Sequence, residues 1–325
     1  MIKKTILFLT IFFELMPISL VYNLKIRRVF FFGGSIAGDF FRKIDKGHNS
    51  VWLLSAVPMV YKRNRHVVTD ILDKDLNLVP VDVCEKNVLG GSIFSLSYLY
   101  KKSFWFQLTT AYEADKVTSC GTFNFTKKKK GMDDFITSVG YNIFPTKDLQ
   151  IVPYIINGIP INRKLDSDER FDNFIGTRYY GLGAGTEFIY SFVNRDETNL
   201  NGVLVARSVH FFPRRWTPVL PCSVTVQPGN VTDFLIAGQY RKKNSIVEAG
   251  YDATFFTNQA TLLTTGSIDE PRSIRQSFYA NFAHLITKVP VIPSPVMFSV
   301  GFFVASLKQY DTKISSFWTS FTILF

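Results

Sequence analysis

The last stretch of the chain, residues 313–325 (KISSFWTSFTILF), is the feature that limits the fold most. Successive side chains of a β-strand point to opposite faces. One face of this strand would carry a nearly continuous apolar band, made of Phe317, Thr319, Phe321, Ile323 and Phe325. The opposite face is largely small and hydroxylic, with Ser316, Ser320 and Thr322 around Trp318. An exposed aromatic strand at a chain end promotes aggregation in a soluble protein, whereas a closed barrel in lipid requires this pattern.

The terminal pattern resembles the last strand of bacterial outer-membrane β-barrels, and the rest of the chain is similar to them in its porin-like architecture only. The resemblance identifies no specific functional family. It implies export to the outer membrane of a Gram-negative cell, with outer-membrane lipids and lipopolysaccharide as partners. It also implies that the barrel assembly machinery recognises an assembly signal formed by Phe317, Phe321, Ile323 and Phe325.

The composition agrees with a membrane barrel. Charged residues make up 19 % of the 325 residues, and aromatic residues make up 15 %, with 32 Phe and 14 Tyr. Soluble domains average about 25 % charged residues. No apolar run after residue 22 reaches the roughly 18 residues that a membrane-spanning helix needs. A barrel with aromatic girdles is therefore expected, and a large soluble β-sandwich is the alternative that composition alone leaves open.

The first 23 residues have the layout of a secretory signal peptide. Lys3 and Lys4 precede an apolar run over residues 5–13, although Glu14 and Pro17 interrupt its continuation and no clean cleavage motif follows. A retained membrane anchor is the alternative. Residues 24–49 are glycine-rich and charged, which suggests a lead-in segment, a partial plug in the lumen or a further strand. Residues 50–325 would form the barrel.

The formal net charge of +11 raises the question of nucleic acid as a partner. Much of the positive charge falls in loop-like pieces such as residues 127–130 and 242–243. In an exported barrel this charge would meet anionic head groups or anionic solutes. We therefore expect no nucleic-acid partner.

Period-two patterning predicts twelve spans, at residues 51–61, 92–100, 104–113, 135–143, 149–156, 178–192, 200–212, 233–240, 247–255, 274–284, 296–305 and 313–325. Their connections alternate in length. The long ones cover residues 62–89, 115–133, 157–177, 213–230 and 258–273, and the short ones cover 101–103, 145–148, 194–199, 241–244 and 287–295. Outer-membrane barrels have short periplasmic turns, longer outer loops and an even strand number. The prediction is an all-β, antiparallel, up-and-down transmembrane barrel of twelve strands, with ten or fourteen as alternatives, and with Phe325 on the periplasmic side.

The polar face of each span should line the lumen, because a charge on the lipid face costs about 2–4 kcal/mol at mid-depth. Asp233 and Gln239 belong to this face, and the candidates for a constriction are Glu113, Glu187, Arg207, Glu248, Asp252 and Asn281. Glu187 and Arg207 lie on neighbouring strands and are expected to pair across the ladder. These residues either satisfy one another and close the interior, or form a charged constriction that selects solutes.

No catalytic or metal-binding pattern is present in the sequence. The four His (His48, His66, His210 and His284) show no ligand spacing, and no motif marks a nucleophile. Gly181, Gly183 and Gly185 alternate within a strand instead of opening a helix, so they do not indicate a nucleotide site. We expect no enzyme activity, no cofactor and no metal.

All three cysteines fall in predicted long loops on the outside. Cys84 and Cys120 lie in consecutive loops, and a disulfide between them is expected in an oxidising compartment. Cys222 would then be free or paired in another way.

These observations favour an outer-membrane channel for passive passage of small solutes, with a preference for anions. A structural or surface-interaction barrel with a closed lumen is the alternative, and an outer-membrane hydrolase ranks third. The sequence indicates neither the solute nor the oligomeric state.

Overall fold

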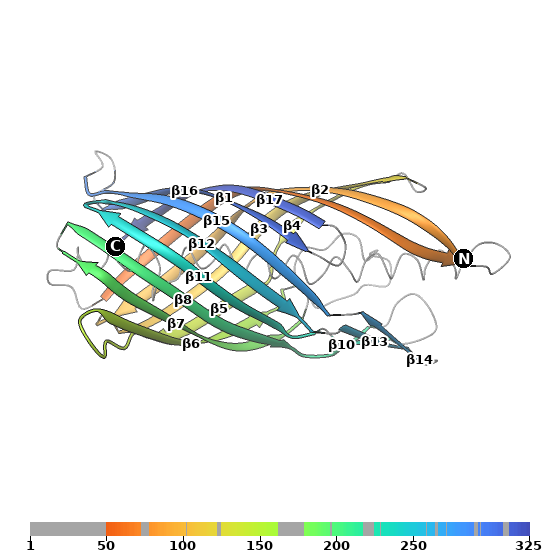
Figure 1. The fold of residues 1–325 in the computed structure, drawn as a ribbon, viewed down its shortest axis with the longest axis horizontal. Helices are drawn as coiled ribbons and strands as arrows, with labels where there is room; N and C mark the ends of the chain where they lie inside the picture. Colours follow the sequence, from red (N-terminus) through yellow and green to blue (C-terminus); the bar gives the residue numbers. More distant parts are fainter. Residues whose placement is uncertain are drawn as a thin grey trace.

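The structure, a computed structural model, describes residues 50–325 except 73–77, 102, 122–124, 162–178, 196, 217–223, 228, 258, 264–265, 271, 289–291, 293 and 308–311. The predicted signal peptide and the segment 24–49 lie outside the described residues. In the described part of the chain, twelve antiparallel strands close into a barrel, as predicted (Figure 1). They are β1 (Ser50–Leu72), β2 (Leu78–Tyr100), β3 (Phe104–Gly121), β5 (Phe135–Tyr141), β6 (Leu149–Ile159), β7 (Gly181–Asn194), β8 (Thr198–Phe211), β11 (Val231–Lys242), β12 (Ser245–Phe256), β15 (Ser273–Ile286), β16 (Val296–Leu307) and β17 (Thr312–Leu324).

The barrel closes between its first and last strands. β1 pairs with β17 from Leu53 opposite Leu324 to Asn64 opposite Lys313. Beyond this register, the Phe325 N–H donates to the Trp52 carbonyl at 2.9 Å, and the Trp52 N–H donates to the Phe325 carbonyl at 3.2 Å. Both ends of the barrel sequence therefore lie at the same end of the barrel, as an even strand number requires.

The connections alternate in length around the barrel. We call the end with the short connections the turn end, and the opposite end the loop end. At the turn end, Lys101 and Lys243 adopt left-handed backbone conformations, with φ of 47° and 53°. Such angles let a connection of two or three residues reverse the chain between neighbouring strands.

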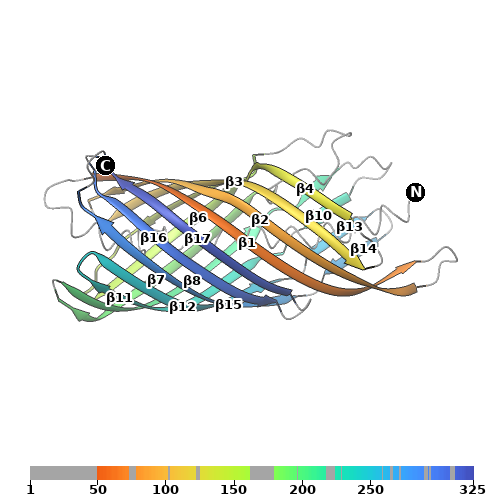
Figure 2. The ribbon, with the colours of Figure 1, turned by 90° about the horizontal axis from the view of Figure 1, so that it is seen from above.

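Two of the predicted polar loops are in fact β-structure. β1 and β2 pair without a shift over 23 residues each, so residues 62–72 and 78–89 continue the hairpin. Its tip, residues 65–72 and 78–82, extends beyond the pairing with β17 and β3 at the loop end (Figure 2). β3 also runs to Gly121 and pairs there with the additional strand β4 (Phe125–Met132). The prediction of loops was wrong because polar composition marks the end of the apolar band, not the end of strand pairing. A tilted strand needs only about 9–11 residues to cross the hydrocarbon.

Two further long connections also contain short strands. β9 (Arg214–Trp216) and β10 (Val224–Gln227) follow β8, and β13 (Gln259–Leu263) and β14 (Gly266–Glu270) follow β12. These four form a separate small sheet in the order β14-β13-β10-β9. The connections after β8 and β12 are therefore joined to each other by strand pairing at the loop end.

The outward face of the barrel is apolar over its middle. On β17, Phe317 and Phe321 are 55 % and 50 % exposed, whereas Trp318, Ser320 and Thr322 between and beside them are buried. The same alternation holds on β1, β8, β11 and β16, so the inward and outward sets follow the predicted faces. Exposed side chains that alternate with buried ones in this way are those of a barrel whose outer surface meets lipid.

No helix in the described part of the chain combines the length and the apolar character needed to cross a membrane.

Candidate functional site

The barrel interior is the candidate site, because every one of its twelve strands places a buried polar residue on the inward face. One such residue from each strand, in chain order, is Ser55, Ser95, Gln107, Ser138, Gln150, Glu187, Arg207, Asp233, Glu248, Ser277, Ser299 and Ser320. Period-two alternation produces this arrangement, since each of these residues lies between outward-facing neighbours. A polar interior distinguishes a lipid-embedded barrel that can hold water from an ordinary β-protein core.

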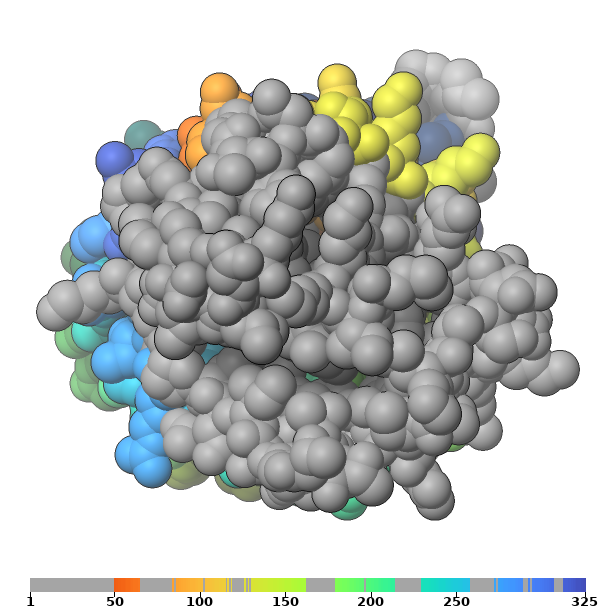
Figure 3. Space-filling model, turned by 90° about the vertical axis from the view of Figure 1, so that its right-hand side faces the viewer, coloured from red at the N-terminus to blue at the C-terminus, as the bar shows by residue number. Residues whose placement is uncertain are grey.

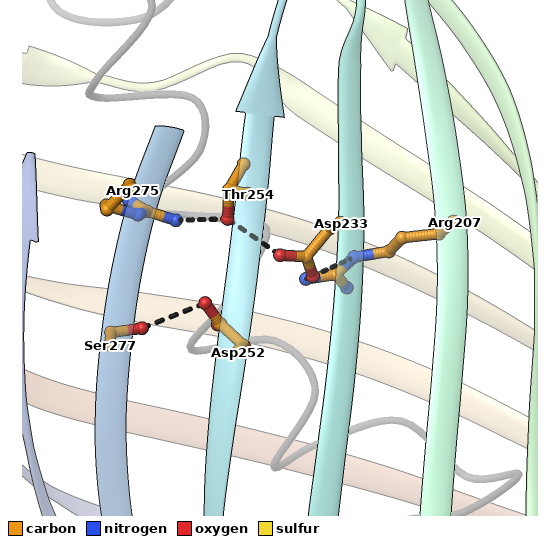
Figure 4. A network of polar contacts seen from close by, with 6 residues as sticks. All are labelled: Arg207, Asp233, Asp252, Thr254, Arg275 and Ser277. Atoms are coloured by element: carbon orange, nitrogen blue, oxygen red, sulfur yellow. Dashed lines mark hydrogen bonds and ion pairs between the residues drawn. The ribbon is translucent and has the colours of Figure 1, made fainter. Parts of the chain in front are cut away.

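One polar network crosses four neighbouring strands near the loop end (Figure 4). Arg207 on β8 lies directly opposite Asp233 on β11, and its Nη2 and Nε atoms are 2.8 Å and 3.0 Å from Asp233 Oδ2. Thr254 on β12 donates its hydroxyl hydrogen to Asp233 Oδ1 at 2.7 Å. Arg275 on β15 donates from Nη2 to the same Thr254 oxygen at 3.1 Å. One carboxylate thus links two buried guanidinium groups across three strand boundaries.

A second network runs around the wall closer to the turn end. Ser191 donates to Asn201 Oδ1 at 2.9 Å, and the Asn201 amide donates to Gln239 Oε1 at 2.9 Å. Gln239 then donates to Glu248 Oε2 at 3.2 Å, and the Tyr279 hydroxyl donates to Glu248 Oε1 at 2.6 Å. The chain of bonds passes from β7 to β15 in strand order. It orients Glu248 by two donors, which is the charge-assisted type of hydrogen bond that holds a carboxylate firmly.

The wall opposite these networks is neutral, and its hydroxyl groups lie among buried apolar side chains. Ser299 and Ser320 are hydrogen-bonded across β16 and β17, and Ser55 Oγ lies 2.8 Å from Thr322 Oγ1 across β1 and β17. Val57, Ile93 and Trp318 belong to a buried apolar cluster on the same strands. The interior therefore has a charged side over β7 to β15 and an uncharged side of hydroxyl and apolar groups over β16, β17, β1 and β2, apart from Arg63 at the loop end of β1.

All six predicted lumen candidates are buried, at 1–4 % exposure, on the inward faces of their strands. Glu248 and Asp252 lie four residues apart on the inward face of β12, and Asn281 lies directly opposite Glu248 on β15. Glu113 lies apart from them on β3. Asp252 accepts a hydrogen bond from Ser277 at 2.9 Å.

The predicted partner of Arg207 needs correction. The residue directly opposite Arg207 on β7 is Gly185, and Glu187 lies diagonally from it. The measured ion pair of Arg207 is with Asp233 on the other neighbouring strand. The sequence prediction considered only the hairpin partner, although each strand of a barrel has two neighbours.

Four aromatic rings lie against inward-facing glycines, a feature that sequence reasoning missed. Trp105 faces Gly140, Tyr154 faces Gly185, Tyr279 faces Gly250 and Trp318 faces Gly301, each pair in direct register. A Cβ added at Gly185 would lie 2.6 Å from Tyr154 Cζ, and one at Gly301 would overlap the Trp318 indole. Each glycine therefore lets a ring lie on the neighbouring strand instead of standing out from the wall. The signal in the sequence was an aromatic residue on one strand and a glycine at the position that faces it on the neighbouring strand.

The interior also has apolar sections. Val203, Val205, Leu235 and Ile246 are buried on the inward faces of β8, β11 and β12 and form part of a larger apolar cluster. Buried polar and buried apolar side chains thus lie at different heights along the inward face of the same strand. The buried interior surface is mixed, unlike the outward face.

Some buried polar atoms in the interior have no hydrogen-bond partner among the described protein groups. They include both amide atoms of Asn281, Nη1 of Arg207 and Nε of Arg275. Buried polar groups in folded proteins are nearly always hydrogen-bonded, to water where no protein partner is present. These atoms mark places where the interior wall is suited to contact water or a polar solute.

His210 and His284, the two histidines whose side chains the structure describes, lie outside the interior. His210 Nδ1 is 2.6 Å from Asn230 Oδ1, and His284 Nδ1 is 2.8 Å from Ser245 Oγ, and both pairs are exposed. A serine nucleophile requires a base that is itself oriented by a third group. The described residues include no cluster of His, Cys, Asp or Glu that is suited to hold a metal ion.

Cys84 and Cys120 lie in strands and not in loops, contrary to the prediction. Cys84 lies in β2 and takes part in a disulfide, and Cys120 is its direct backbone partner on β3. The pairing of Cys84 with Cys120 stays a prediction that this register favours. Cys222 falls outside the described residues.

Comparisons with known proteins show the fold and no family. No protein-family model matches the sequence, and no characterised protein matches it either. The structure is similar to an outer membrane channel from Pseudomonas putida F1, with a TM-score of 0.57 and 9 % identity over 83 % of this chain and 95 % of that one. The monoaromatic hydrocarbon channel CymD gives a TM-score of 0.36 at 8 % identity, covering 86 % of this chain and 89 % of its own. The outer membrane protease OmpT from Escherichia coli gives 0.33 at 8 % identity, covering 86 % and 96 %. The last two likenesses are too distant to support any inference.

Proposed function

We propose that this chain is a channel of the bacterial outer membrane through which small polar solutes pass passively. The observation that carries the proposal is the buried polar residue that each of the twelve strands contributes to the inward face. A lumen that carries water and polar solutes requires a polar lining of this kind. The similarity in fold to an outer membrane channel agrees with the proposal.

The aromatic–glycine pairs support an interior with free space. Trp105, Tyr154, Tyr279 and Trp318 belong to the aromatic residues of the inward face, and each lies over a glycine of a neighbouring strand. A ring held against the wall takes up less of the lumen than a ring that stands out from it. The unpartnered polar atoms of Asn281, Arg207 and Arg275 support hydration of the same interior.

The constriction would lie at the level of the Arg207–Asp233 pair, with Glu113, Glu187, Glu248, Asp252 and Asn281 as further lining residues. The basic composition favours anions. The charges on the inward faces of the described barrel strands are nearly balanced, with Arg63, Arg207, Arg241 and Arg275 against Glu113, Glu187, Asp233, Glu248 and Asp252. A preference for anions therefore depends on how Arg207 and Arg275 face the solute, and the overall charge selectivity should be weak.

The location and assembly of the chain belong to the same proposal. The outward apolar band suits the outer membrane, and Phe317, Phe321 and Phe325 are exposed on the last strand, where the assembly machinery would meet them. Ile323 lies on the same face.

A structural or surface-interaction barrel with a closed lumen is the second candidate. The apolar inward cluster that includes Val203, Val205 and Leu235 favours it, because such side chains pack as in a protein core. The two functions differ in one measurable property, which is permeability.

Solute uptake by proteoliposomes tests the proposal. Purified, correctly folded protein is reconstituted into liposomes, and swelling is recorded in isosmotic solutions of neutral sugars of increasing size. The channel predicts swelling that slows with sugar size and is absent in liposomes without protein. Liposomes that contain the folded protein and never swell would support the closed barrel.

A further inference from the structure

A group of exposed lysines forms a patch on one side of the barrel at the loop end. The patch consists of Lys62 on β1, Lys86 on β2, Lys116 on β3, Lys128 and Lys130 on β4, and Lys313 on β17. All six side chains are exposed on the outward face. The five strands are consecutive in the wall, in the order β17, β1, β2, β3 and β4. The lysine patch is therefore one continuous surface although its residues span most of the sequence.

The strand register places five of these lysines in two neighbouring rows, and Lys130 lies in the next row toward the turn end, opposite Ala114. One row contains Lys313, Asn64, Lys86 and Thr118, and the other contains Ser315, Lys62, Val88, Lys116 and Lys128. Lys116 and Lys128 are direct cross-strand partners, and Lys86 is a diagonal neighbour of both Lys62 and Lys116. Directly opposed side chains on a sheet have Cβ atoms about 4.5–5.5 Å apart, and like charges at this spacing repel.

No carboxylate lies among the lysines of the patch. The outward positions of the two rows and their neighbours, residues 62, 64, 86, 88, 114, 116, 118, 126, 128, 130, 313 and 315, include no Asp or Glu. Glu113 on β3 is buried on the inward face, and Asp70 and Asp82 belong to the tip of the β1–β2 hairpin, beyond the two rows. A group of six ammonium groups with no carboxylate among them is suited to receive an anion with several negative groups.

The patch lies immediately beyond the apolar band. Each lysine-bearing strand has an exposed apolar residue within two outward positions of its lysine toward the turn end: Val60, Val88, Tyr112, Met132 and Phe317. Lysine stems extend along apolar surface while the ammonium group reaches the head-group layer. In the end view of Figure 3, orange residues of the β1–β2 hairpin and yellow residues of β4 lie on the same side of the rim. The patch is thus at the height of lipid head groups and on one side of the barrel only.

We propose that the lysine patch binds the phosphorylated head group of lipopolysaccharide in the outer leaflet. Its two phosphates on a compact sugar backbone match two rows of lysines better than a lipid with a single phosphate does. Binding neutralises the repulsion between Lys116 and Lys128 and joins the β1–β2 hairpin to β3 and β4 through one ligand. The proposal is independent of conduction through the barrel.

The disulfide of Cys84 supports this site. Cys84 follows Lys86 by one outward position toward the loop end, and Cys120 follows Thr118 in the same way. A covalent link at this point would hold β2 and β3 together beside the lysine patch, where repulsion would otherwise separate them.

Titration of the full-length folded protein with fluorescently labelled lipopolysaccharide tests the proposal. The variant K86Q/K116Q/K128Q should bind at least tenfold more weakly than the wild type. The charge-preserving variant K86R/K116R/K128R should stay within about threefold. The matched control K147Q/K242Q/K288Q removes three exposed lysines at the turn end and should change the affinity less than twofold. Heat-modifiable gel migration establishes that each variant is folded.

Three further results decide the identity of the ligand. Dephosphorylated lipopolysaccharide should bind at least tenfold more weakly than the intact lipid, and added salt should weaken the binding of intact lipid because the lysines are exposed. If the glutamine variant and the wild type bind equally, the lysine patch is not the binding site for the lipid. If the dephosphorylated and the intact lipid bind equally, the lysines do not recognise the phosphate groups of the lipid. Displacement of the lipid by millimolar inorganic phosphate would overturn the assignment to a lipid and indicate a site for free phosphate.

Discussion

Arg207 on β8 and Asp233 on β11 lie directly opposite each other and form a buried ion pair of 2.8 Å on the inward face of the barrel. Asp233 also accepts a hydrogen bond from Thr254, which receives a second one from Arg275. A buried carboxylate that serves two guanidinium groups holds both of them in fixed positions on the wall. This arrangement gives Arg207 a fixed place beside the path that a solute would take.

Replacement of Arg207 by glutamate should shift the selectivity of the channel toward cations. The change removes a guanidinium and places a second carboxylate beside Asp233, so the local charge becomes strongly negative. The measurement is the reversal potential of single channels in a KCl gradient. The control K242E makes the same change in charge at an exposed position of the turn end and should leave the reversal potential nearly unchanged. If R207E and the wild type give the same reversal potential, Arg207 does not line the constriction.

Gly301→Val should lower the conductance. A Cβ at Gly301 would overlap the Trp318 indole, so the ring must leave the wall and enter the lumen. Single-channel conductance and the tryptophan emission spectrum report the two effects. Gly238→Val is the matched control, because Gly238 faces outward and a Cβ there meets no atom within 4 Å. A normal conductance in G301V together with a shifted emission spectrum would show that Trp318 moves without entering the path.

Cys84→Ser should loosen the loop end and leave the barrel intact. The disulfide of Cys84 lies beyond the level at which β1 pairs with β17, so its loss affects the extended part of β2 and β3. Limited proteolysis should cut the variant within residues 62–89 or 115–133 faster than the wild type, while heat-modifiable migration stays the same. Cys120→Ser should behave identically if the two cysteines are paired. Unequal cleavage of the two variants would assign the disulfide to another partner.

Deletion of Phe325 should reduce assembly more than the loss of another lipid-facing aromatic residue. Phe325 makes two backbone hydrogen bonds to Trp52 that complete the closure between β17 and β1, and it ends the predicted assembly signal. The measurement is the amount of heat-modifiable protein in the outer-membrane fraction. Phe302→Ala is the comparison, because Phe302 is 52 % exposed on the adjacent strand β16. If the two variants give equal amounts of folded protein in the outer-membrane fraction, Phe325 is not part of the assembly signal.

The alternation of side chains was sufficient to predict all twelve barrel strands and their inward faces. Lipid imposes an apolar outward residue at every second position, so Phe317 and Phe321, or Phe278 and Phe282, mark a span without knowledge of its neighbours. The extent of β1 and β2 was not predictable in this way. Beyond the lipid no such rule acts on the side chains, and residues 62–72 and 78–89 read as a polar loop while their backbones pair in register.

The pairing of side chains inside the barrel was less accessible to sequence reasoning. Burial of Glu187, Arg207 and Glu248 follows from their parity, but the partner of Arg207 depends on the register between β8 and β11, which are separated by a long connection. The same limit applies to Trp318 and Gly301, whose contact depends on the register of β16 and β17. Positions along one strand are encoded locally, whereas contacts between strands depend on the closed barrel.

The conductance of the wild-type protein in a planar lipid bilayer tests the central claim most directly. The protein is first shown to be folded by heat-modifiable migration and is then added to one side of the bilayer in potassium chloride. An interior with polar residues on all twelve strands and aromatic rings held against the wall predicts discrete current steps of uniform size. A folded protein that inserts and produces no steps would contradict the channel and leave the closed barrel as the function of this fold.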